Sequence, residues 1–517
     1  MSHVTLILLL LVATTLLAVL AQRLKLAYPI VLVLGGLVLG LVPGLPRIAL
    51  DPELVFELFL PPLLFAAAFF MPWPEFKANL RPILLLAVGL VGATAAAVAY
   101  VASAIFGLPL AVGFALGAIV SPPDAIAATA IAERLRLPHR MIVILEGESL
   151  INDAAGLVLF RFAVAAVVTG AFSLDMALLE LVKLAIGGIV LGLVVGWLAI
   201  QLYRRLDDPA VVTVLTLLSP FAAYTPAELL GFSGVLAAVA GGIYIGWNAP
   251  VAFTPPTRVR ATFVWTTLIF LLNGLAFILI GLQLPFILQE IADEPPLRLA
   301  LAALAVSFVV IAVRAVWVYS IAWISQLVIP RRYHLNRSLG WRHLAVLSWA
   351  GMRGIVSLAA ALALPETIAS GEPFPYRGLV LFLAFAVILV TLVLQGLTLP
   401  PLLRGLGVCE PGNEDERVEA RRFALEAALI RLDELAARED LPAEGIAHLR
   451  ERYRHSLRVL DERDVDVGDM ETHRRLQLEL IEAERKVLLD MRQHGAISDG
   501  IFHDLERALD MRVTWLN

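Results

Sequence analysis

Thirteen long apolar stretches, separated by short polar breaks, fill the first four hundred residues of the chain. An α-helix rises about 1.5 Å per residue and the hydrocarbon core of a bilayer is about 30 Å thick, so about twenty apolar residues cross it once. The pattern therefore predicts an all-α membrane protein of about thirteen transmembrane helices. The expected spans lie near residues 3–21, 27–43, 52–71, 82–106, 109–132, 141–169, 176–203, 210–225, 230–248, 261–290, 297–329, 342–365 and 376–403.

Composition indicates that a water-exposed tail follows the membrane domain. Hydrophobic residues make up 59% of the 517 positions and charged residues only 16%, whereas about a quarter of a soluble domain is charged. Residues 405–517 nevertheless hold 26 of the 45 acidic and 17 of the 40 basic residues. The stretches 423–439 and 474–493 show helical apolar spacing. We therefore predict a transmembrane domain at 1–404 and a helical cytoplasmic tail at 405–517.

The remaining composition narrows the classes of function. The single cysteine, Cys409, excludes an intrachain disulfide and has no metal-site spacing around it. No basic cluster stands apart from the loop ends, so we expect no nucleic-acid partner, and we expect no cofactor. The apolar run after His3 lacks the features of a secretory signal and is interpreted as the first span.

Positive charge alternates between the loops and predicts an orientation. One set of alternate loops carries fifteen Lys and Arg residues, whereas the intervening loops carry only Arg47, Arg298 and Arg377. Because the basic loops face the cytoplasm, the N-terminus should lie outside the cell membrane and the tail inside. The first six and the last six spans then have opposite orientations, which is typical of transporters built from two inverted six-helix repeats.

Glycines at four-residue spacing mark two of the spans. The seventh span contains Gly188, Gly192 and Gly196, and the fifth contains Gly113 and Gly117. Such spacing places small residues on one side of a helix, and it predicts close packing against a neighbouring helix.

The fifth span contains a proline pair followed directly by an acid, in the sequence SPPDAIAATAI. Pro122 and Pro123 lack backbone N–H donors and bias Ser121 away from helical geometry. The carbonyl groups freed by such a break cannot face lipid. Asp124 follows near the bilayer centre, where a carboxylate is costly and usually functional. The structural alternative is a proline kink with a hydrogen-bonded Asp.

The sixth span carries a polar stripe in the sequence EGESLINDAAG. Glu148 and Asn152 are four residues apart, as are Ser149 and Asp153, so one side of the helix presents all four. Gly156 on the same side would let another segment approach. We expect Asp153 near mid-membrane depth, where it can share a site with Asp124. A purely structural hydrogen-bond network is the alternative.

The twelfth span carries Arg353 between two glycines, in the sequence GMRGIVSLA. A lone arginine at this depth is costly, and a buried acid is its natural partner. We therefore predict a structural ion pair between Glu148 and Arg353, which also braces a broken span and leaves Asp153 as the free carboxylate.

Other intramembrane polar residues are weaker candidates. Arg314 could pair with an acid. Asn273 and Gln283 are typical of interhelical hydrogen bonds rather than ion ligands. Glu146 lies nearer the inner face, where it could line an entry funnel.

These stretches resemble the sodium/proton exchanger family, which comprises NhaP-like and NHE-like monovalent cation:proton antiporters. The similar segments are 121–131, 146–160, 270–284 and 351–359, in family order. The resemblance implies a homodimer with a dimerisation domain and a mobile core, in which discontinuous fifth and twelfth spans cross near the centre.

The resemblance also implies roles for single residues. Asn152 and Asp153 would form the ion site, Asp124 would support it, and Ser149 would help to coordinate the ion. The Glu148–Arg353 pair would be structural. An Asn before Asp153 implies electroneutral exchange. Ala66 departs from the pattern, because relatives often place an acid there.

Chemistry favours transport of a hard cation by these groups. Sodium prefers oxygen ligands, and Asp153, Ser149 and Asp124 supply them. A carboxylate that holds either a proton or a cation, combined with alternating access, couples the two movements. We therefore predict a secondary active transporter, not an enzyme, that exchanges sodium or lithium for protons in pH homeostasis.

Other functions were weighed against exchange of sodium. A potassium/proton antiporter of the same fold and a non-transporting membrane sensor stay open. An ion channel is disfavoured because no filter-like segment occurs, and an intramembrane aspartic protease because its Gly-x-Gly-Asp signature is absent.

Overall fold

The computed structural model divides into two compact units, residues 1–410 and 411–517, where the sequence predicted 1–404 and 405–517. It describes residues 3–42, 51–135, 137–170, 174–291, 294–328, 340–368, 371–408, 414–438, 443–461 and 467–494, with short pieces between 501 and 513. Cys409 and Arg47 lie outside the described residues. We call residues 1–410 the first unit and residues 411–517 the second unit.

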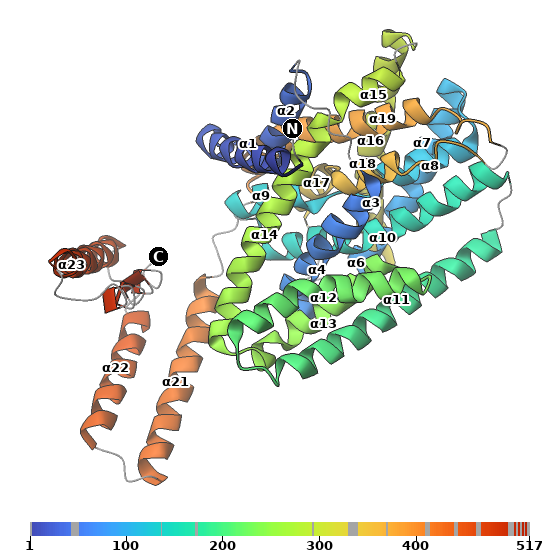
Figure 1. The fold of residues 1–517 in the computed structure, drawn as a ribbon. Coiled ribbons are helices and arrows are strands. Elements are labelled where there is room, and N and C mark those ends of the chain that lie inside the picture. The colour runs from blue at the N-terminus through green and yellow to red at the C-terminus, as the bar shows by residue number, and fades with distance from the viewer. Residues whose placement is uncertain are drawn as a thin grey trace. The chain divides into compact units, whose positions relative to one another are not determined.

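The described regular elements of the first unit are all helices, and an isolated β-bridge joins Thr367 to Pro373. The predicted spans coincide, in chain order, with α1 (His3–Leu24), α2 (Tyr28–Gly40), α3, η1 and α4 (Pro52–Leu54, Val55–Phe59 and Leu60–Phe70), α6, η2 and α7 (Leu80–Leu84, Leu85–Leu90 and Val91–Phe106), α8 and α9 (Leu110–Val120 and Ala125–Leu135), α10 (His139–Thr169), α11 (Leu174–Tyr203), α12 (Pro209–Leu229), α13 (Gly234–Ala252), α14 and α15 (Pro255–Leu282 and Leu284–Glu290), α16 (Pro296–Val328), α17 and α18 (Trp341–Trp349 and Ile355–Leu362), and α19, η4 and α20 (Arg377–Val390, Thr391–Gln395 and Gly396–Leu406) (Figure 1). A short helix, α5 (Trp73–Ala78), joins the third and fourth spans. The prediction of an all-helical membrane protein is confirmed.

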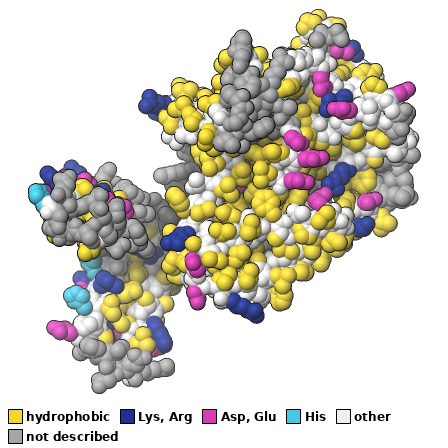
Figure 2. Space-filling view, viewed as in Figure 1, with side chains coloured by type: hydrophobic (Ala, Val, Ile, Leu, Met, Phe, Trp, Pro, Cys, Tyr) yellow, Lys and Arg dark blue, Asp and Glu magenta, His cyan; other side chains and the backbone are white. Residues whose placement is uncertain are grey.

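Length and composition support membrane crossing. Within the described residues, ten helical segments are long and apolar enough to span a bilayer, and shorter apolar helices occupy Leu8–Leu24 and Tyr28–Gly40. Large apolar side chains are exposed on the outer helices, among them Leu16, Trp197 and Phe308. Figure 2 shows hydrophobic side chains over much of the visible face of the first unit. A water-soluble protein rarely exposes so much apolar surface, whereas lipid solvates it.

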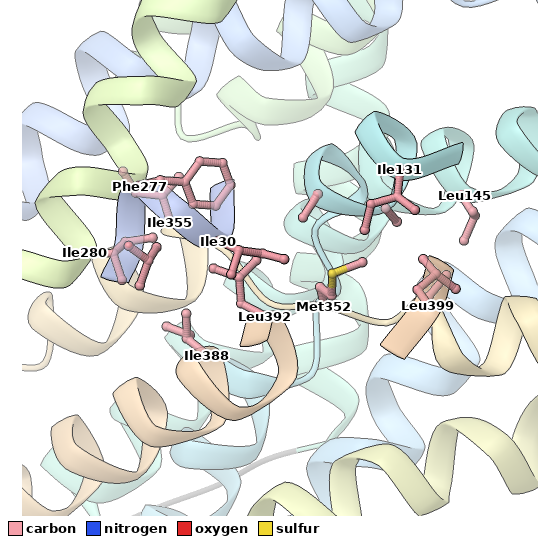
Figure 3. Packing of buried hydrophobic residues seen from close by; sticks show 14 of the residues in the cluster. Ile30, Ile131, Leu145, Phe277, Ile280, Met352, Ile355, Ile388, Leu392 and Leu399 are labelled. Atoms are coloured by element: carbon pink, nitrogen blue, oxygen red, sulfur yellow. The ribbon is translucent and has the colours of Figure 1, made fainter. Parts of the chain in front are cut away.

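The break between α17 and α18 is anchored by apolar packing from many helices. Met352, in the middle of this break, belongs to a cluster of buried side chains (Figure 3). The cluster draws on α2, α9, α10, α14, α19, η4 and α20 through Ile30, Ile131, Leu145, Phe277, Ile388, Leu392 and Leu399. Close packing around Met352 holds the irregular backbone in one position.

The glycine spacings mark close helix contacts, as predicted. A Cβ atom on Gly188 would lie 2.5 Å from the carbonyl oxygen of Ser233, and one on Gly192 would collide with that of Ala237. Gly117 approaches the Ala95 carbonyl in the same way, at 2.5 Å. Thus α11 packs against α13, and α8 against α7, at backbone distance.

The second unit is helical, as its apolar spacing predicted. It contains α21 (Glu414–Arg438), α22 (Ala443–Asp461) and α23 (Val467–Gln493). Arg450 of α22 pairs with Asp433 of α21 at 2.6 Å, and Arg512 pairs with Glu484 of α23 at 2.8 Å. These exposed pairs add little stability each. Ile481, Phe502 and Leu509 are buried apolar side chains of this unit.

We expect Gly192→Ala and Gly117→Ala to destabilise the first unit by about 1–3 kcal/mol each, because the added methyl group meets backbone atoms of the neighbouring helix. Gly92→Ala is the matched control, since a Cβ atom there has no neighbour within 4 Å. Thermal unfolding in detergent measures the effect. Equal midpoints for all three variants would contradict the packing assignment.

Candidate ion-binding site

Two helix breaks meet at the centre of the first unit. One separates α8 from α9 at residues 121–124, and the other separates α17 from α18 at residues 350–354. The backbone N–H of Asp124 donates a hydrogen bond to the Met352 carbonyl at 2.7 Å. The fifth and twelfth predicted spans are therefore discontinuous and touch at their breaks.

Arg353 binds the carbonyl groups that the breaks leave free. Its Nε donates to the Val120 carbonyl at 2.8 Å, its Nη2 to the Ser121 carbonyl at 3.3 Å, and its Nη1 to the Gly351 carbonyl. The side chain is only 1% exposed. Its positive charge thus lies at the negative, C-terminal end of α8, where it satisfies acceptors that no water or lipid could reach.

The predicted pair between Glu148 and Arg353 is wrong, because Arg314 of α16 takes that place. Arg314 donates to both carboxylate oxygens of Glu148, at 2.5 and 2.8 Å, and its Nε donates to the Leu347 carbonyl at 3.1 Å. Both charged side chains are 1% exposed. Arg353 is occupied by carbonyl groups, so the acid on α10 requires a different partner. The expected role of Arg353 in bracing the broken span agrees with its contacts.

Asp124 occupies the N-cap position of α9. Its Oδ1 accepts a hydrogen bond from the Ile126 N–H at 2.8 Å, which satisfies one of the free donors of the first turn. A Cβ atom on Gly354 would collide with the same carboxylate, so the start of α18 also approaches it closely. The positive N-terminal ends of two half-helices therefore surround Asp124.

Ser149 and Asn152 of α10 bind the first break. Ser149 Oγ accepts from the Ala125 N–H at 3.4 Å, and Asn152 Nδ2 donates to the Pro123 carbonyl at 2.8 Å. Gly156, one turn further on, leaves room for the Pro122 ring. The polar stripe predicted on this helix therefore faces the broken segment.

A cavity of about 470 Å³ opens beside the breaks. Asp124, Ser149 and Asp153 line it, together with Glu146 at its edge, whereas Asn152 is fully buried and is not part of the lining. The Asp153 carboxylate accepts no hydrogen bond from the part of the chain that the structure describes. Asp153 and Asp124 thus line the same cavity.

A second cavity, of about 660 Å³, lies on the other side of Asp153 along α10. Residues 146, 149, 150 and 153 of α10 line the first cavity, and residues 154, 157, 158, 160 and 161 line the second. The same division occurs along η1 and α4, where Glu57 lies in the second cavity and Leu60 in the first. Asp153 therefore marks the boundary between two chambers.

The sequence did not reveal every residue that shapes this site. It named Arg314 only as a side chain that could pair with some acid, since depth along a helix does not give direction. Thr391, which accepts a hydrogen bond from the Arg353 N–H at 3.2 Å, was not singled out. Ala66 and Asn273 both line the first cavity, and only Ala66 had been considered near an ion site.

Comparison with known proteins identifies the same family over the membrane unit. The family model described as "Sodium/hydrogen exchanger, transmembrane" matches residues 7–405. A protein of Mycobacterium tuberculosis named as an uncharacterized Na⁺/H⁺ exchanger is 37% identical over 505 residues, covering 95% of this chain and 92% of its own length. The sodium, potassium, lithium and rubidium/H⁺ antiporter of Bacillus subtilis is 32% identical and covers 95% of this chain and 74% of its own length.

A solved structure has the same fold. The sodium proton antiporter MjNhaP1 from Methanocaldococcus jannaschii superposes with a TM-score of 0.62 at 22% identity, covering 79% of this chain and 99% of that chain. With the family model and the relatives in agreement, the chain belongs to the sodium/hydrogen exchanger family of monovalent cation/proton antiporters.

Proposed function

We propose that this protein exchanges sodium or lithium for protons, one for one, at Asp153. The observation that supports this most is the position of a buried carboxylate, without a hydrogen-bond donor in the described residues, at the boundary between two cavities. A carboxylate in this position can hold a proton or a cation, but not both at once. Access from one cavity and then the other turns this competition into exchange.

The partners of the other buried charges support the same assignment. Glu148 is neutralised by Arg314, Arg353 is held by three backbone carbonyls, and Asp124 is held by the start of α9. A charged group that keeps a fixed partner does not bind a proton and a cation in turn during transport. Asp153 is then the one group among these five whose occupant changes, which favours the exchange of one cation for one proton without net charge movement.

In this proposal, oxygen atoms from two elements hold the cation. Asp153 supplies the charged ligand, while the Ser149 hydroxyl and the Asp124 carboxylate complete the near side. A hard monovalent cation prefers such ligands. A movement of α10 and the two breaks relative to α4 and α14 would close the first cavity over the ion and join it to the second.

The setting of the protein follows from the loop charges and the family. We place it in the cell membrane with the N-terminus outside and the tail in the cytoplasm, and we propose that it works as a homodimer. Potassium is the second candidate cation, because the Bacillus subtilis relative is named for sodium, potassium, lithium and rubidium.

Asp153→Asn should abolish exchange, because an amide can neither release a proton nor balance a cation. Purified protein in liposomes carrying a proton gradient and a pH-sensitive dye provides the measurement: sodium dissipates the gradient with the wild type and leaves it intact with the variant. Glu146→Gln is the control, since Glu146 lines the same cavity but is not assigned as a ligand. Sodium-driven proton movement by the Asp153→Asn protein would refute the proposal.

Transport should move no net charge. A carrier that moved one charge per cycle would gain about 2.3 kcal/mol per 100 mV, which is about 50-fold in an equilibrium gradient. The final sodium gradient in liposomes at a fixed pH difference should therefore be the same at any potential set with potassium and valinomycin. A gradient that follows the imposed voltage would exclude one-for-one exchange.

The corrected ion pair can be tested by charge rescue. Glu148→Gln leaves Arg314 buried without its acid, at a cost of about 3–5 kcal/mol. We expect the double variant Glu148→Gln/Arg314→Gln to recover part of the lost thermal stability in detergent, whereas Glu148→Gln/Arg353→Gln is less stable than either single variant. If Arg353→Gln instead recovered the stability lost in Glu148→Gln, the result would contradict the Glu148–Arg314 pair and support the predicted Glu148–Arg353 pair.

A further inference from the structure

One side of α14 lines the first cavity, which Asp124 and Asp153 also line. Thr266, Ile269, Phe270 and Asn273 line it, at the spacing of one helix face. The Thr266 hydroxyl donates to the Thr262 carbonyl of its own helix at 2.8 Å, so that group already has a partner. Asn273 is the other polar residue of this face.

Asn273 has a buried oxygen that lacks a partner. The side chain is 3% exposed, and its Oδ1 accepts no hydrogen bond from any residue that the structure describes. The sequence favoured an interhelical hydrogen bond at this position, and the described residues supply no partner for this oxygen. Buried amide oxygens are nearly always satisfied by a donor, a water or an ion, so an orphan oxygen in a cavity lining points to a ligand.

The side chains that α4 contributes to the cavity lining explain why an additional oxygen ligand matters. Leu63, Leu64, Ala66 and Ala67 of α4 line the same cavity and contribute no oxygen from their side chains. A cation held by Asp153, Ser149 and Asp124 would thus take its side-chain oxygen ligands from α10 and the first break. An amide oxygen on α14 adds a ligand from another helix without adding a charge.

The backbone of α14 is fixed where Asn273 stands. A Cβ atom on Gly36 of α2 would collide with the Ile278 carbonyl, and one on Gly281 would collide with the Val33 carbonyl. The two helices therefore touch along their backbones at residues 278 and 281, about one to two turns beyond Asn273. A ligand carried by such a rigid pair holds its position, and a fixed position discriminates between ions of different radius.

We propose that Asn273 is a cation ligand that sets ion preference, with its amide oxygen completing the coordination of the ion held at Asp153. This inference rests on the proposed function. Because the amide is neutral, it acts on the affinity for the cation and not on the number of protons exchanged.

The test compares Asn273→Leu, which has a similar volume and no oxygen, with Thr266→Val on the same helix face. Proton efflux from liposomes is measured against the concentrations of lithium, sodium and potassium. We expect Asn273→Leu to raise the KM for sodium about tenfold or more, as for loss of a contact to a charged group. The ratio of KM values between ions should change, while the rate at saturating sodium stays close to that of the wild type. Thr266→Val should leave every KM unchanged.

Three results would overturn the inference. These are unchanged KM values for all three ions in Asn273→Leu, an equal shift in Thr266→Val, or a lower maximal rate and thermal stability at constant KM. The last result would assign Asn273 to packing alone. Asn273→Asp, which keeps an oxygen, should retain a low KM for sodium. If Asn273 proves not to be a ligand, Asp153→Asn would still abolish exchange. The two proposals can therefore be refuted independently.

Discussion

The structure depends on how backbone groups are satisfied where no water or lipid can reach them. Two interrupted helices each leave free donors and acceptors at the middle of the membrane unit, and such groups are tolerated only when protein supplies partners. Here the breaks supply them for each other: the Asp124 N–H binds the Met352 carbonyl, and Arg353 binds the carbonyls of Val120 and Ser121. This mutual satisfaction places the polar ends of the half-helices beside α10, whose Ser149 and Asn152 bind the first break.

A second constraint is the balance of buried charge. Arg353, which binds backbone carbonyls, keeps a positive charge near the proposed site. The pairing of Glu148 with Arg314 leaves that acid unavailable to a cation. Asp153 is left lining a cavity that Asp124 also lines. The two helix N-termini at Asp124 and the charge of Arg353 offset this concentration of acid.

Most of the fold could be predicted from the sequence, because lipid imposes a simple rule of length and polarity on every span. The break in the fifth span was predictable from Pro122 and Pro123, whose missing donors are a local property. The partner of Glu148 could not be predicted, because depth along a helix does not give the direction of a side chain. Both Arg314 and Arg353 lie within membrane spans, so depth alone did not distinguish them. Asn273 was assigned to helix contacts for the same reason: an unsatisfied oxygen becomes visible only when all its neighbours are placed.

The central claim is that a cation and a proton compete for Asp153. Calorimetry of sodium binding to the purified protein, repeated in buffers of different ionisation enthalpy, counts the protons released for each cation bound. The account predicts one proton released per sodium at a pH where the carboxyl is protonated, and no sodium binding to Asp153→Asn. Sodium binding without proton release at every pH would contradict it.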